Sequence, residues 1–428
     1  MLLQFSVRNY KSIKDKAVLS LEAGTNRENA DNYAVMENGD RILKGAVIFG
    51  ANAGGKSNIF LALTSALLAV RRSVYNLPGA PLWPFTPFSF SEETKNAPSE
   101  FEFVFTYKGV KYIYGFSATS LRVEEEHLYA YRTPRPSTIF QREGDDYYFP
   151  ESIKSRMQPL VERNLPNKLF ISTSASWNCP YTVEPMEWLM KGIDTYDTRY
   201  QDTMAKASEM YASDTDGSLK RFTSDLLREA DINISDFNLE TEEKTPGRIA
   251  EEQHMSDGLK NLLFSGLDTD ARVNSLRCEM FHDVTDGTES RRYRLDFEEE
   301  SLGTKNLFMF APFIRKALDE GLTIFVDEFD SSLHPLLLEY IVSLFMKSET
   351  NRNNAQLVIS SHSMELMNLD IFRRDQIYFI DKDRATGASS LYSLDEFSIR
   401  PTFSKLRESY LSGRFKAVPK IGKGANIY

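Results

Sequence analysis

The sequence predicts an α/β fold in which a phosphate-binding core carries an antiparallel β lobe and a mainly helical insertion. Three observations support this fold class. A glycine-rich loop lies between a strand-like and a helix-like segment, a β-rich stretch follows that helix, and short apolar runs alternate with helical segments in the last third of the chain. Such alternation is typical of a parallel sheet that is buried on both faces.

Composition limits the class of protein. The 428 residues suffice for two or three domains, or for one large α/β domain with an insertion, and 41% apolar and 12% aromatic residues are ordinary for a globular protein. Cys179 and Cys278 are isolated, and the five histidines lack metal-ligand spacing. No run reaches the roughly 18 apolar residues of a membrane span, and the start does not resemble a signal peptide. We therefore expect a cytoplasmic protein with no membrane segment.

Charge is distributed unevenly along the chain. The formal net charge of −10 argues against a surface that is basic throughout. Residues 405–428 nevertheless contain six basic residues and one acidic residue, Glu408. This basic tail is either a solvated segment or a surface for an acidic partner or a nucleic-acid backbone. Its basic residues are Lys405, Arg407, Arg414, Lys416, Lys420 and Lys423.

The first half of the core is expected in residues 1–150. Two β-rich runs at the start suggest a hairpin that leads to a strand at 46–49. Residues 58–74 have apolar side chains at a helical period. Residues 88–149 then predict an antiparallel sheet, with a hairpin turn at Lys108-Gly109.

Residues 151–254 differ in pattern and predict a mainly helical insertion. Helices are expected at 151–164, 183–193 and 217–230, with a short buried strand at 168–172 and a polar loop at 240–253.

The second half of the core is expected in residues 255–428. It begins with two strands, and three apolar runs that alternate with helices follow them. The strands are expected at 275–283 and 291–297, and the apolar runs at 322–326, 357–360 and 376–380.

The glycine-rich loop GANAGGKSN fits the pattern Gly, four residues, Gly-Lys-Ser. In such a loop the backbone N–H groups and a helix N-terminus surround the β-phosphate of a nucleotide. Lys56 would reach the β- and γ-phosphates, and the Ser57 hydroxyl would bind Mg²⁺. We expect ATP and Mg²⁺ here, with contacts from Gly50, Ala51, Asn52, Ala53, Gly54, Gly55, Lys56, Ser57 and Asn58.

A second site feature is the pair Asp327-Glu328 at the end of an apolar run. One carboxylate at such a strand end can hold Mg²⁺, and the next can polarise an attacking water as a general base. We assign these roles to Asp327 and Glu328 respectively. Lys56 and Asp327 are 271 residues apart. Ring-forming motors and small GTPases place the two motifs much closer together, so a large insertion splits this core.

Two further features lie close to this pair in sequence. Residues 301–304, Ser-Leu-Gly-Thr, directly precede a helix, where serine commonly acts as an N-cap. The same serine, the Gly303 backbone and the helix N-terminus would also hold an anion. His362 ends the apolar run at 357–360, a position at which a lone histidine is usually structural.

These four motifs, in this order, resemble the ABC-type branch of ATPases that includes SMC and RecF-like heads. The resemblance implies that Ser301, Gly303 and Thr304 are presented across a dimer interface to the γ-phosphate of the partner's ATP. It also implies that His362 senses the γ-phosphate and that Glu328 is catalytic. Residues 330–334 take the place of the loop that couples the two sites. The glutamine that such sites place near Mg²⁺ stays unassigned, with Gln141 and Gln158 both available.

Several stretches are also similar to the AAA-type ATPases of bacterial abortive-infection operons, which include RloA-like proteins and the ATPase subunit of PARIS-type anti-phage systems. The similarity covers about 1–120 and 255–420 and is weakest across the insertion. It implies a slow, regulatory ATPase that forms homodimers or larger homo-oligomers. Such a sensor or scaffold would control a separately encoded toxic effector, often a nuclease of the TOPRIM class, in response to a phage-derived trigger. The stretches are FSVRNYKSIKDKAVLSL, GANAGGKSN, PSEFEFVF, ESLGTKNLF, DEFDSSLHP, SSHS and QIYFIDKD with YLSGRFKAVP.

Two other functions fit parts of the sequence. A DNA-engaging repair or recombination ATPase of the RecF or SMC type would use the basic tail, although no segment sustains coiled-coil heptads. A self-contained nuclease needs a second acidic metal site, and none is evident outside the ATPase motifs. Overcoming-lysogenization-defect nucleases carry a TOPRIM domain after a similar ATPase, and too few residues follow Asp383 for such a domain.

Overall fold

The computed structural model describes residues 1–26, 28–197, 200–230, 233–245, 273–287, 289–330, 333–397 and 403–418. The chain forms two compact units, one of residues 1–198 with 316–428 and the other of residues 199–315. The units therefore meet in sequence near 198 and 315, whereas the sequence suggested divisions after 150 and 254.

A six-stranded sheet forms the core of the first unit, in the order β11-β15-β16-β5-β17-β18. All neighbours pair in parallel except β17 and β18, which form an antiparallel hairpin. Every residue of β5 and β16 is buried, as expected for strands covered on both faces. The predicted strands at 46–49, 322–326, 357–360 and 376–380 are all confirmed. The strands are β5 (Gly45–Phe49), β11 (Ile193–Asp197), β15 (Thr323–Asp327), β16 (Gln356–Ser360), β17 (Ile377–Lys382) and β18 (Ser389–Ser393).

Strand β11 lies within the stretch predicted to be an insertion, yet it pairs with β15 along five residues. It begins directly after a short helical segment, Trp188–Gly192, which the sequence had predicted as the end of a longer helix. The chain thus contributes β5 and β11 to its core sheet before it enters the second unit, and the other four strands after it leaves that unit.

An antiparallel seven-stranded sheet forms the lobe of the first unit, in the order β10-β9-β8-β7-β6-β1-β2. Aromatic side chains fill its inner face, among them Phe103, Tyr114 and Phe140, which are fully buried. The hairpin at Lys108-Gly109 is confirmed. The strands are β1 (Leu2–Arg8), β2 (Ala17–Ser20), β6 (Ser99–Tyr107), β7 (Val110–Ala118), β8 (Val123–Tyr131), β9 (Ser137–Glu143) and β10 (Asp146–Tyr148), beside a small sheet of β3 (Tyr33–Val35) and β4 (Arg41–Leu43).

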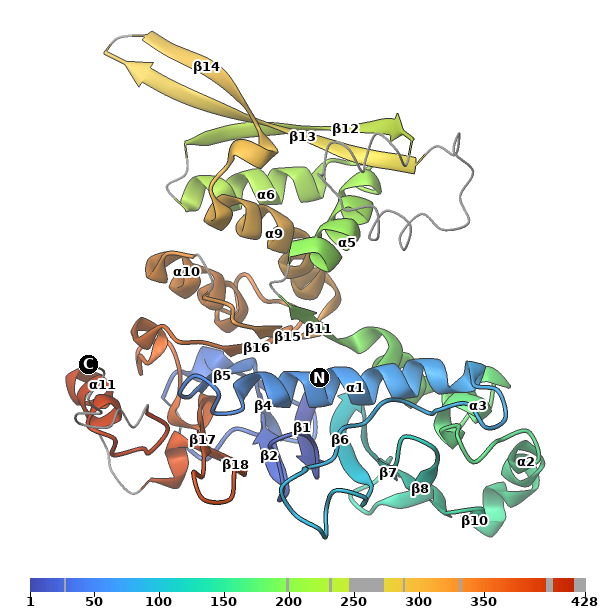
Figure 1. The fold of residues 1–428 in the computed structure, drawn as a ribbon. Coiled ribbons are helices and arrows are strands. Elements are labelled where there is room, and N and C mark those ends of the chain that lie inside the picture. Colours follow the sequence, from blue (N-terminus) through green and yellow to red (C-terminus); the bar gives the residue numbers. More distant parts are fainter. Residues whose placement is uncertain are drawn as a thin grey trace, which may run out of the picture. The chain divides into compact units, whose positions relative to one another are not determined.

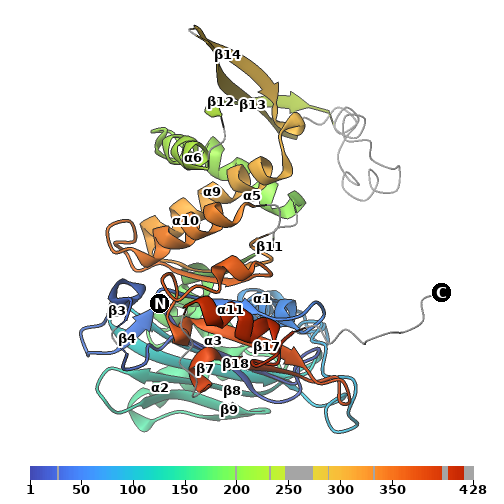
Figure 2. The same ribbon diagram turned by 90° about the vertical axis from the view of Figure 1, so that its left-hand side faces the viewer.

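Helix α1 packs against β15 and β11 of the core sheet and against β1 of the lobe, and so lies between the two sheets (Figure 1). Figure 2 shows β7, β8 and β9 of the lobe beside one another. Helices of the first unit also pack on one another and on the core sheet. These helices are α1 (Lys56–Arg72), α2 (Glu151–Val161), α3 (Phe170–Ser176), α4 (Val183–Glu187), α10 (Pro335–Met346) and α11 (Phe403–Leu411).

The strand predicted at 168–172 is wrong, because this segment begins helix α3. The carboxylate of the buried Glu126 accepts the backbone N–H groups of Phe170 (2.6 Å) and Ile171 (3.0 Å). These are N–H groups of the first helical turn, which have no partner within the helix. A residue on β8 therefore caps α3, and nothing in the local apolar pattern reveals it.

The second unit packs helices against a three-stranded antiparallel sheet, in the order β12-β13-β14. The hairpin of β13 and β14 projects beyond α6 and α9 of this unit (Figures 1 and 2). The predicted loop at 240–253 is wrong in its first part, which belongs to β12; residues 246–253 lie outside the described residues. The elements are α5 (Tyr200–Ala212), α6 (Ser218–Glu229), β12 (Ile234–Lys244), β13 (Val273–Asp286), β14 (Glu289–Asp296) and α9 (Leu302–Glu320), whose last turn belongs to the first unit.

Helix α9 continues through Pro312, which has no backbone N–H to donate to the carbonyl of Phe308 one turn earlier. The hydroxyl of Tyr211 donates to that carbonyl instead (2.8 Å). Tyr211 is buried, and its ring stacks on Phe308 at 4.8 Å. The proline thus lies where α9 packs against Tyr211 of α5, within the second unit.

Among the described residues, no helix is long and apolar enough to cross a membrane. The basic tail is described only in part. Arg407 forms an ion pair with Glu365 (3.6 Å), and Lys420 and Lys423 lie outside the described residues.

Candidate nucleotide site

The glycine-rich loop connects β5 to α1, as the sequence predicts. Gly55 has φ of 113°, and a Cβ there would lie 2.5 Å from the hydroxyl of Ser389. Only glycine fits this close approach with this backbone conformation. Asn52 and Ala53 at the tip of the loop are exposed, whereas Gly54 is buried. The loop therefore presents backbone to the outside while its base is fixed against the protein.

Lys56, the first residue of α1, is buried, and its ammonium group donates to the Gly50 carbonyl (2.7 Å). Burial lowers the pKa of Lys56, and the nearby carboxylates of Asp327, Asp330 and Glu328 oppose this shift. A desolvated ammonium group beside the loop is suited to attract phosphate oxygens. Ser57 follows on α1 and is partly exposed.

Asp327 and Glu328 are held by one hydroxyl group, that of Ser360 on the neighbouring strand β16. Ser360 Oγ donates to Asp327 Oδ1 (2.5 Å) and accepts the backbone N–H of Glu328 (2.8 Å). Glu328 has φ of 51°, a left-handed conformation that is uncommon for residues other than glycine. Backbone strain of this kind is often found at functional sites. The Glu328 side chain is exposed at the strand end, where it is free to face a ligand.

Asp330 positions His362. One carboxylate oxygen of Asp330 accepts the backbone N–H groups of His362 and Ser363, both at 2.7 Å. Partial desolvation lowers the pKa of His362, and the positive charge of Lys56 lowers it further, which favours the neutral imidazole. A neutral imidazole can donate one hydrogen bond to a phosphate oxygen without adding charge.

Strand register brings these groups to one edge of the sheet. Ile48 of β5 lies beside Ser360 of β16, and Val326 of β15 lies beside Ile359. The phosphate loop, Asp327-Glu328 and His362 therefore all follow the carboxyl ends of adjacent parallel strands. Ligands of open α/β sheets bind at this edge. The structure thus brings together the predicted residues of the first unit.

These residues fit ATP and Mg²⁺. The ammonium group of Lys56 at the base of the loop suits phosphate oxygens. The hydroxyl of Ser57 and the carboxylate of Asp327 are oxygen ligands of the kind that Mg²⁺ prefers. Among the described residues, no group of three or more His, Cys, Asp or Glu side chains could hold a metal by itself. Mg²⁺ would accordingly be held by one or two protein groups together with the nucleotide phosphates.

The predicted signature residues lie in the second unit, at the start of α9. Ser301 Oγ accepts the backbone N–H of Thr304 (3.1 Å) and lies 2.8 Å from Thr304 Oγ1, so the serine is an N-cap. Just before it, Glu300 Oε1 lies 2.7 Å from Nε2 of His282 on β13. Ser301 and Leu302 are exposed, as a loop that contacts a second molecule requires. The N-cap role is compatible with anion binding, because the helix N-terminus remains at this position.

A hollow of about 910 Å³ adjoins the phosphate loop. It is lined by residues 50–54, by His362, by the turn between β17 and β18, and by Tyr410 and Leu411 of α11. Neither Gln141 nor Gln158 lines it; Gln141 donates to the hydroxyl of Tyr129 on the lobe (2.7 Å). The glutamine that ABC-type sites place near Mg²⁺ therefore stays unassigned.

Sequence reasoning missed two supporting residues. Ser360, which fixes the acidic pair, lies in the motif SSHS that drew attention only for its histidine. Ser389 donates to the Gly54 carbonyl (2.8 Å) and lies on β18, 335 residues further along the chain. Nothing in the sequence indicates that a single serine so far along the chain contacts the phosphate loop.

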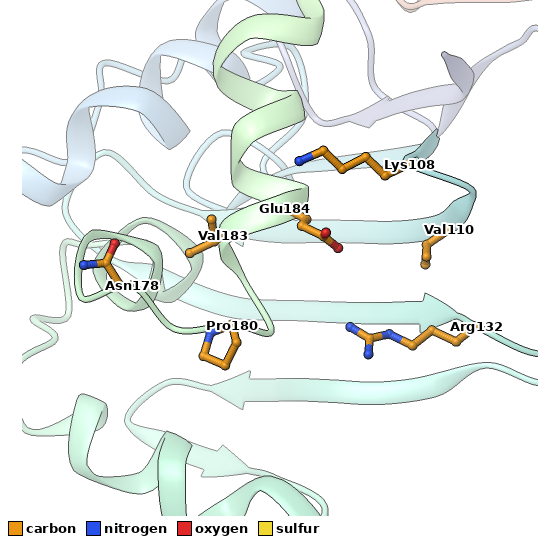
Figure 3. Close-up of a pocket in the computed structure, with 7 residues that line it drawn as sticks. All are labelled: Lys108, Val110, Arg132, Asn178, Pro180, Val183 and Glu184. Carbon is orange, nitrogen blue, oxygen red and sulfur yellow. The ribbon is translucent and has the colours of Figure 1, made fainter.

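A second hollow, of about 680 Å³, lies on the lobe and is separate from the phosphate loop (Figure 3). Its charged groups already have protein partners. Lys108 pairs with Glu187 (2.9 Å), and Glu184 accepts the hydroxyl of Tyr112 (3.1 Å), whose pKa burial raises to about 12. None of the predicted site residues lines this hollow.

Known structures of similar extent include the SmcHead bound to the C-winged helix domain of ScpA, with 12% identity and a TM-score of 0.41. The match covers 92% of this chain and 97% of that chain. CbiO1 from Clostridium perfringens, part of the ABC transporter complex CbiONQ, has 9% identity and a TM-score of 0.31, with coverage of 96% and 95%.

No curated protein matches the chain. A family of ATPase domains does: its sequence profile, described as "AAA domain, putative AbiEii toxin, Type IV TA system", matches residues 46–368. This range runs from β5 to the residues just after His362 and so includes every predicted site motif. With three quarters of its length in this match, the chain belongs to that AAA family.

Proposed function

We propose that this protein binds and slowly hydrolyses ATP, dimerises around the bound nucleotide, and thereby controls a separately encoded toxic effector in anti-phage defence. The observation that carries the proposal is the shared Ser360 hydroxyl, which holds Asp327 and Glu328 at the strand end beside the phosphate loop. A fixed Asp327 carboxylate beside a fixed Glu328 backbone is suited to nucleotide hydrolysis at that place.

Each residue has one role in the proposed reaction. The phosphate loop and Lys56 bind the β- and γ-phosphates, and Ser57 with Asp327 holds Mg²⁺, which neutralises phosphate charge. Glu328 accepts the proton of the attacking water. His362, kept neutral, donates to the γ-phosphate. These residues position and polarise, which is most of what phosphoryl transfer requires of a protein.

The second half of the site would come from another copy of the chain. Ser301, the Gly303 backbone, Thr304 and the N-terminus of α9 would contact the γ-phosphate held by the partner. Exposure of Ser301 and Leu302 supports this arrangement. ATP binding would then close a head-to-tail homodimer, and hydrolysis would open it.

The defence role rests on the family and on the resemblance to RloA-like and PARIS-type ATPases. The family description names a toxin of a type IV toxin–antitoxin system. In the proposed role the ATP-bound dimer, or a larger homo-oligomer, restrains or releases an effector such as a TOPRIM-class nuclease. A phage-derived molecule would be the trigger, and the cytoplasm would be the compartment.

The decisive experiment is the Glu328→Gln variant. Loss of the general base should lower kcat for ATP hydrolysis by about 10² to 10⁴, while ATP binding stays within about threefold of wild type. Light scattering after gel filtration should find a dimer with ATP and a monomer without it. The proposal fails if Glu328→Gln hydrolyses ATP at the wild-type rate, or if the protein is monomeric with ATP.

The same preparation separates the defence role from a DNA-engaging repair ATPase. A repair ATPase predicts that duplex DNA stimulates hydrolysis and that DNA affinity falls steeply with salt. A defence scaffold predicts that an effector co-purifies from native cells with the ATP-bound Glu328→Gln variant and leaves after the nucleotide is removed.

A further inference from the structure

The order of strands determines which way a bound nucleotide must extend. Strand β5, which leads into the phosphate loop, lies between β16 and β17. The groups proposed to contact the γ-phosphate follow β15 and β16, on one side of β5. A nucleotide with its β-phosphate in the loop and its γ-phosphate on that side extends its sugar and base to the other side, where the hairpin of β17 and β18 lies.

An exposed aromatic ring lies on that side. Phe90 is 73% exposed, yet it lines the same hollow as residues 50–54 and His362. An exposed aromatic ring at the wall of a hollow beside a phosphate loop is the kind of surface on which a nucleotide base stacks.

Contacts with Phe88 and Asn9 hold the loop that carries Phe90 in place. Phe90 packs edge-to-face on the buried Phe88 at 5.7 Å. The backbone N–H of Phe88 donates to Oδ1 of the buried Asn9 (2.9 Å), and the side-chain amide of Asn9 donates to the carbonyls of Thr94 (2.9 Å) and Ala97 (3.0 Å). A ring fixed in this way loses little freedom when a ligand stacks on it.

The turn between β17 and β18 gives the ring its second support. Gly387 has φ of 71°, and a Cβ at this position would lie 2.7 Å from Cδ2 of Phe90. Asp383 fixes the turn, because its Oδ1 accepts the backbone N–H groups of Ala385 (3.0 Å) and Thr386 (2.7 Å). Glycine at 387 thus allows Phe90 to rest directly on the turn.

The same hairpin is tied to the phosphate loop. Ser389, two residues after Gly387, donates to the Gly54 carbonyl (2.8 Å) and lies 2.8 Å from the hydroxyl of Ser12. The ring, the turn and the phosphate loop are therefore linked by direct contacts within the first unit. A fixed distance between a phosphate cradle and an aromatic platform suits a ligand that carries both groups.

We propose that Phe90, supported by Gly387, is the base-stacking platform of the nucleotide site. This inference rests on the proposed function, because it takes the ligand to be a nucleoside triphosphate. Stacking tolerates different bases, so the platform contributes affinity for the nucleoside and leaves base identity to other groups.

Isothermal titration with two probes, ATP and inorganic tripolyphosphate, both with Mg²⁺, tests the platform. Phe90→Ala should weaken ATP binding by about tenfold, the low end of what a base–aromatic stack contributes. Tripolyphosphate has no base, and its affinity should be unchanged. Phe90→Trp keeps an aromatic face and should bind ATP like wild type. Gly387→Ala, which pushes the ring aside, should lower ATP affinity without affecting tripolyphosphate.

Tyr148→Ala is the matched control, because Tyr148 is an exposed aromatic residue on β10 that does not line this hollow. It should bind both probes like wild type. The proposal is overturned if Phe90→Ala binds ATP as tightly as wild type, or if it loses both probes equally. Failure of the proposed function would give a different result, because the wild-type protein itself would then bind no ATP.

Discussion

The two units fix their predicted site residues in different ways. In the first unit, the hydrogen bonds from Ser360 to Asp327, from His362 to Asp330 and from Ser389 to Gly54 join residues 33, 32 and 335 positions apart. In the second unit, the bonds around the signature loop join Thr304 to Ser301, Lys305 to Glu298 and His282 to Glu300, only 3, 7 and 18 positions apart.

This difference shows which of the predicted site residues depend on contacts between distant segments of the chain. The proposed nucleotide site of the first unit exists only when distant segments of that unit have assembled. These hydrogen bonds around the proposed signature loop all lie within residues 282–305, so they depend less on distant segments of the chain. We therefore expect loss of the long-range hydrogen bonds of the first unit to affect folding, and changes at the proposed signature loop to affect mainly hydrolysis.

The largest effect is expected from Arg142→Met in the first unit. Arg142 is buried, donates to the carbonyls of Gly144 (2.9 Å) and Lys168 (2.7 Å), and pairs with the buried Glu126 (3.7 Å). Burial raises the pKa of Glu126, and Arg142 opposes that shift. Removal of the guanidinium leaves a buried carboxyl group uncompensated, at a cost of about 3–5 kcal/mol in the free energy of unfolding.

Tryptophan fluorescence during urea unfolding measures this loss, because the tryptophans at 83, 177 and 188 all belong to the first unit. Arg8→Met on the same lobe is the control, since the ion pair of Arg8 with Glu100 is exposed and should contribute about 0–1 kcal/mol. Equal stabilities of the two variants would show that the first unit does not depend on its buried polar contacts.

The next effect is expected from Ser301→Ala. If Ser301 donates to the partner's γ-phosphate, kcat should fall by about 100-fold, as when one donor to a developing oxyanion is removed, with ATP affinity unchanged. Ser301→Asp separates this role from helix capping, because aspartate is a good N-cap but repels phosphate. An active Ser301→Asp variant would mean that the serine serves only the helix.

The smallest effect is expected from Tyr211→Phe in the second unit. The variant loses the hydroxyl that satisfies the Phe308 carbonyl and that lies 2.9 Å from Thr223 Oγ1. The cost should be about 1–2 kcal/mol, mainly from the buried carbonyl left without a partner. Hydrogen exchange should become faster in α9 and α6 but not in β5 or β16. Faster exchange in both units would contradict the view that the second unit is held locally.

The sequence suffices for the features that depend on local pattern. The four parallel strands, helix α1, the hairpin at Lys108-Gly109 and the placement of Asp327-Glu328 and His362 at strand ends all follow from short apolar runs and from turn residues. These elements can be predicted because each has its own periodic pattern of apolar residues or its own turn residues.

Other features depend on partners far away in the chain. Residues 168–172 look like a strand, and only the carboxylate of Glu126 makes them start a helix. Strand β11 joins the core sheet because β15 offers a free edge, a fact that no local pattern contains. Phe90 likewise resembles any surface aromatic until Gly387 and the phosphate loop are seen beside it.

The hydroxyl of Ser360 couples the position of the Asp327 carboxylate to that of the Glu328 backbone. It has a single hydrogen, given to Asp327, and its oxygen receives the Glu328 N–H. A shift of the Asp327 carboxylate is therefore passed through one oxygen atom to the peptide that sets the turn of Glu328. Asp327 would hold Mg²⁺ and Glu328 would act as the base, so the Ser360 hydroxyl would couple the position of the metal ligand to the position of the base.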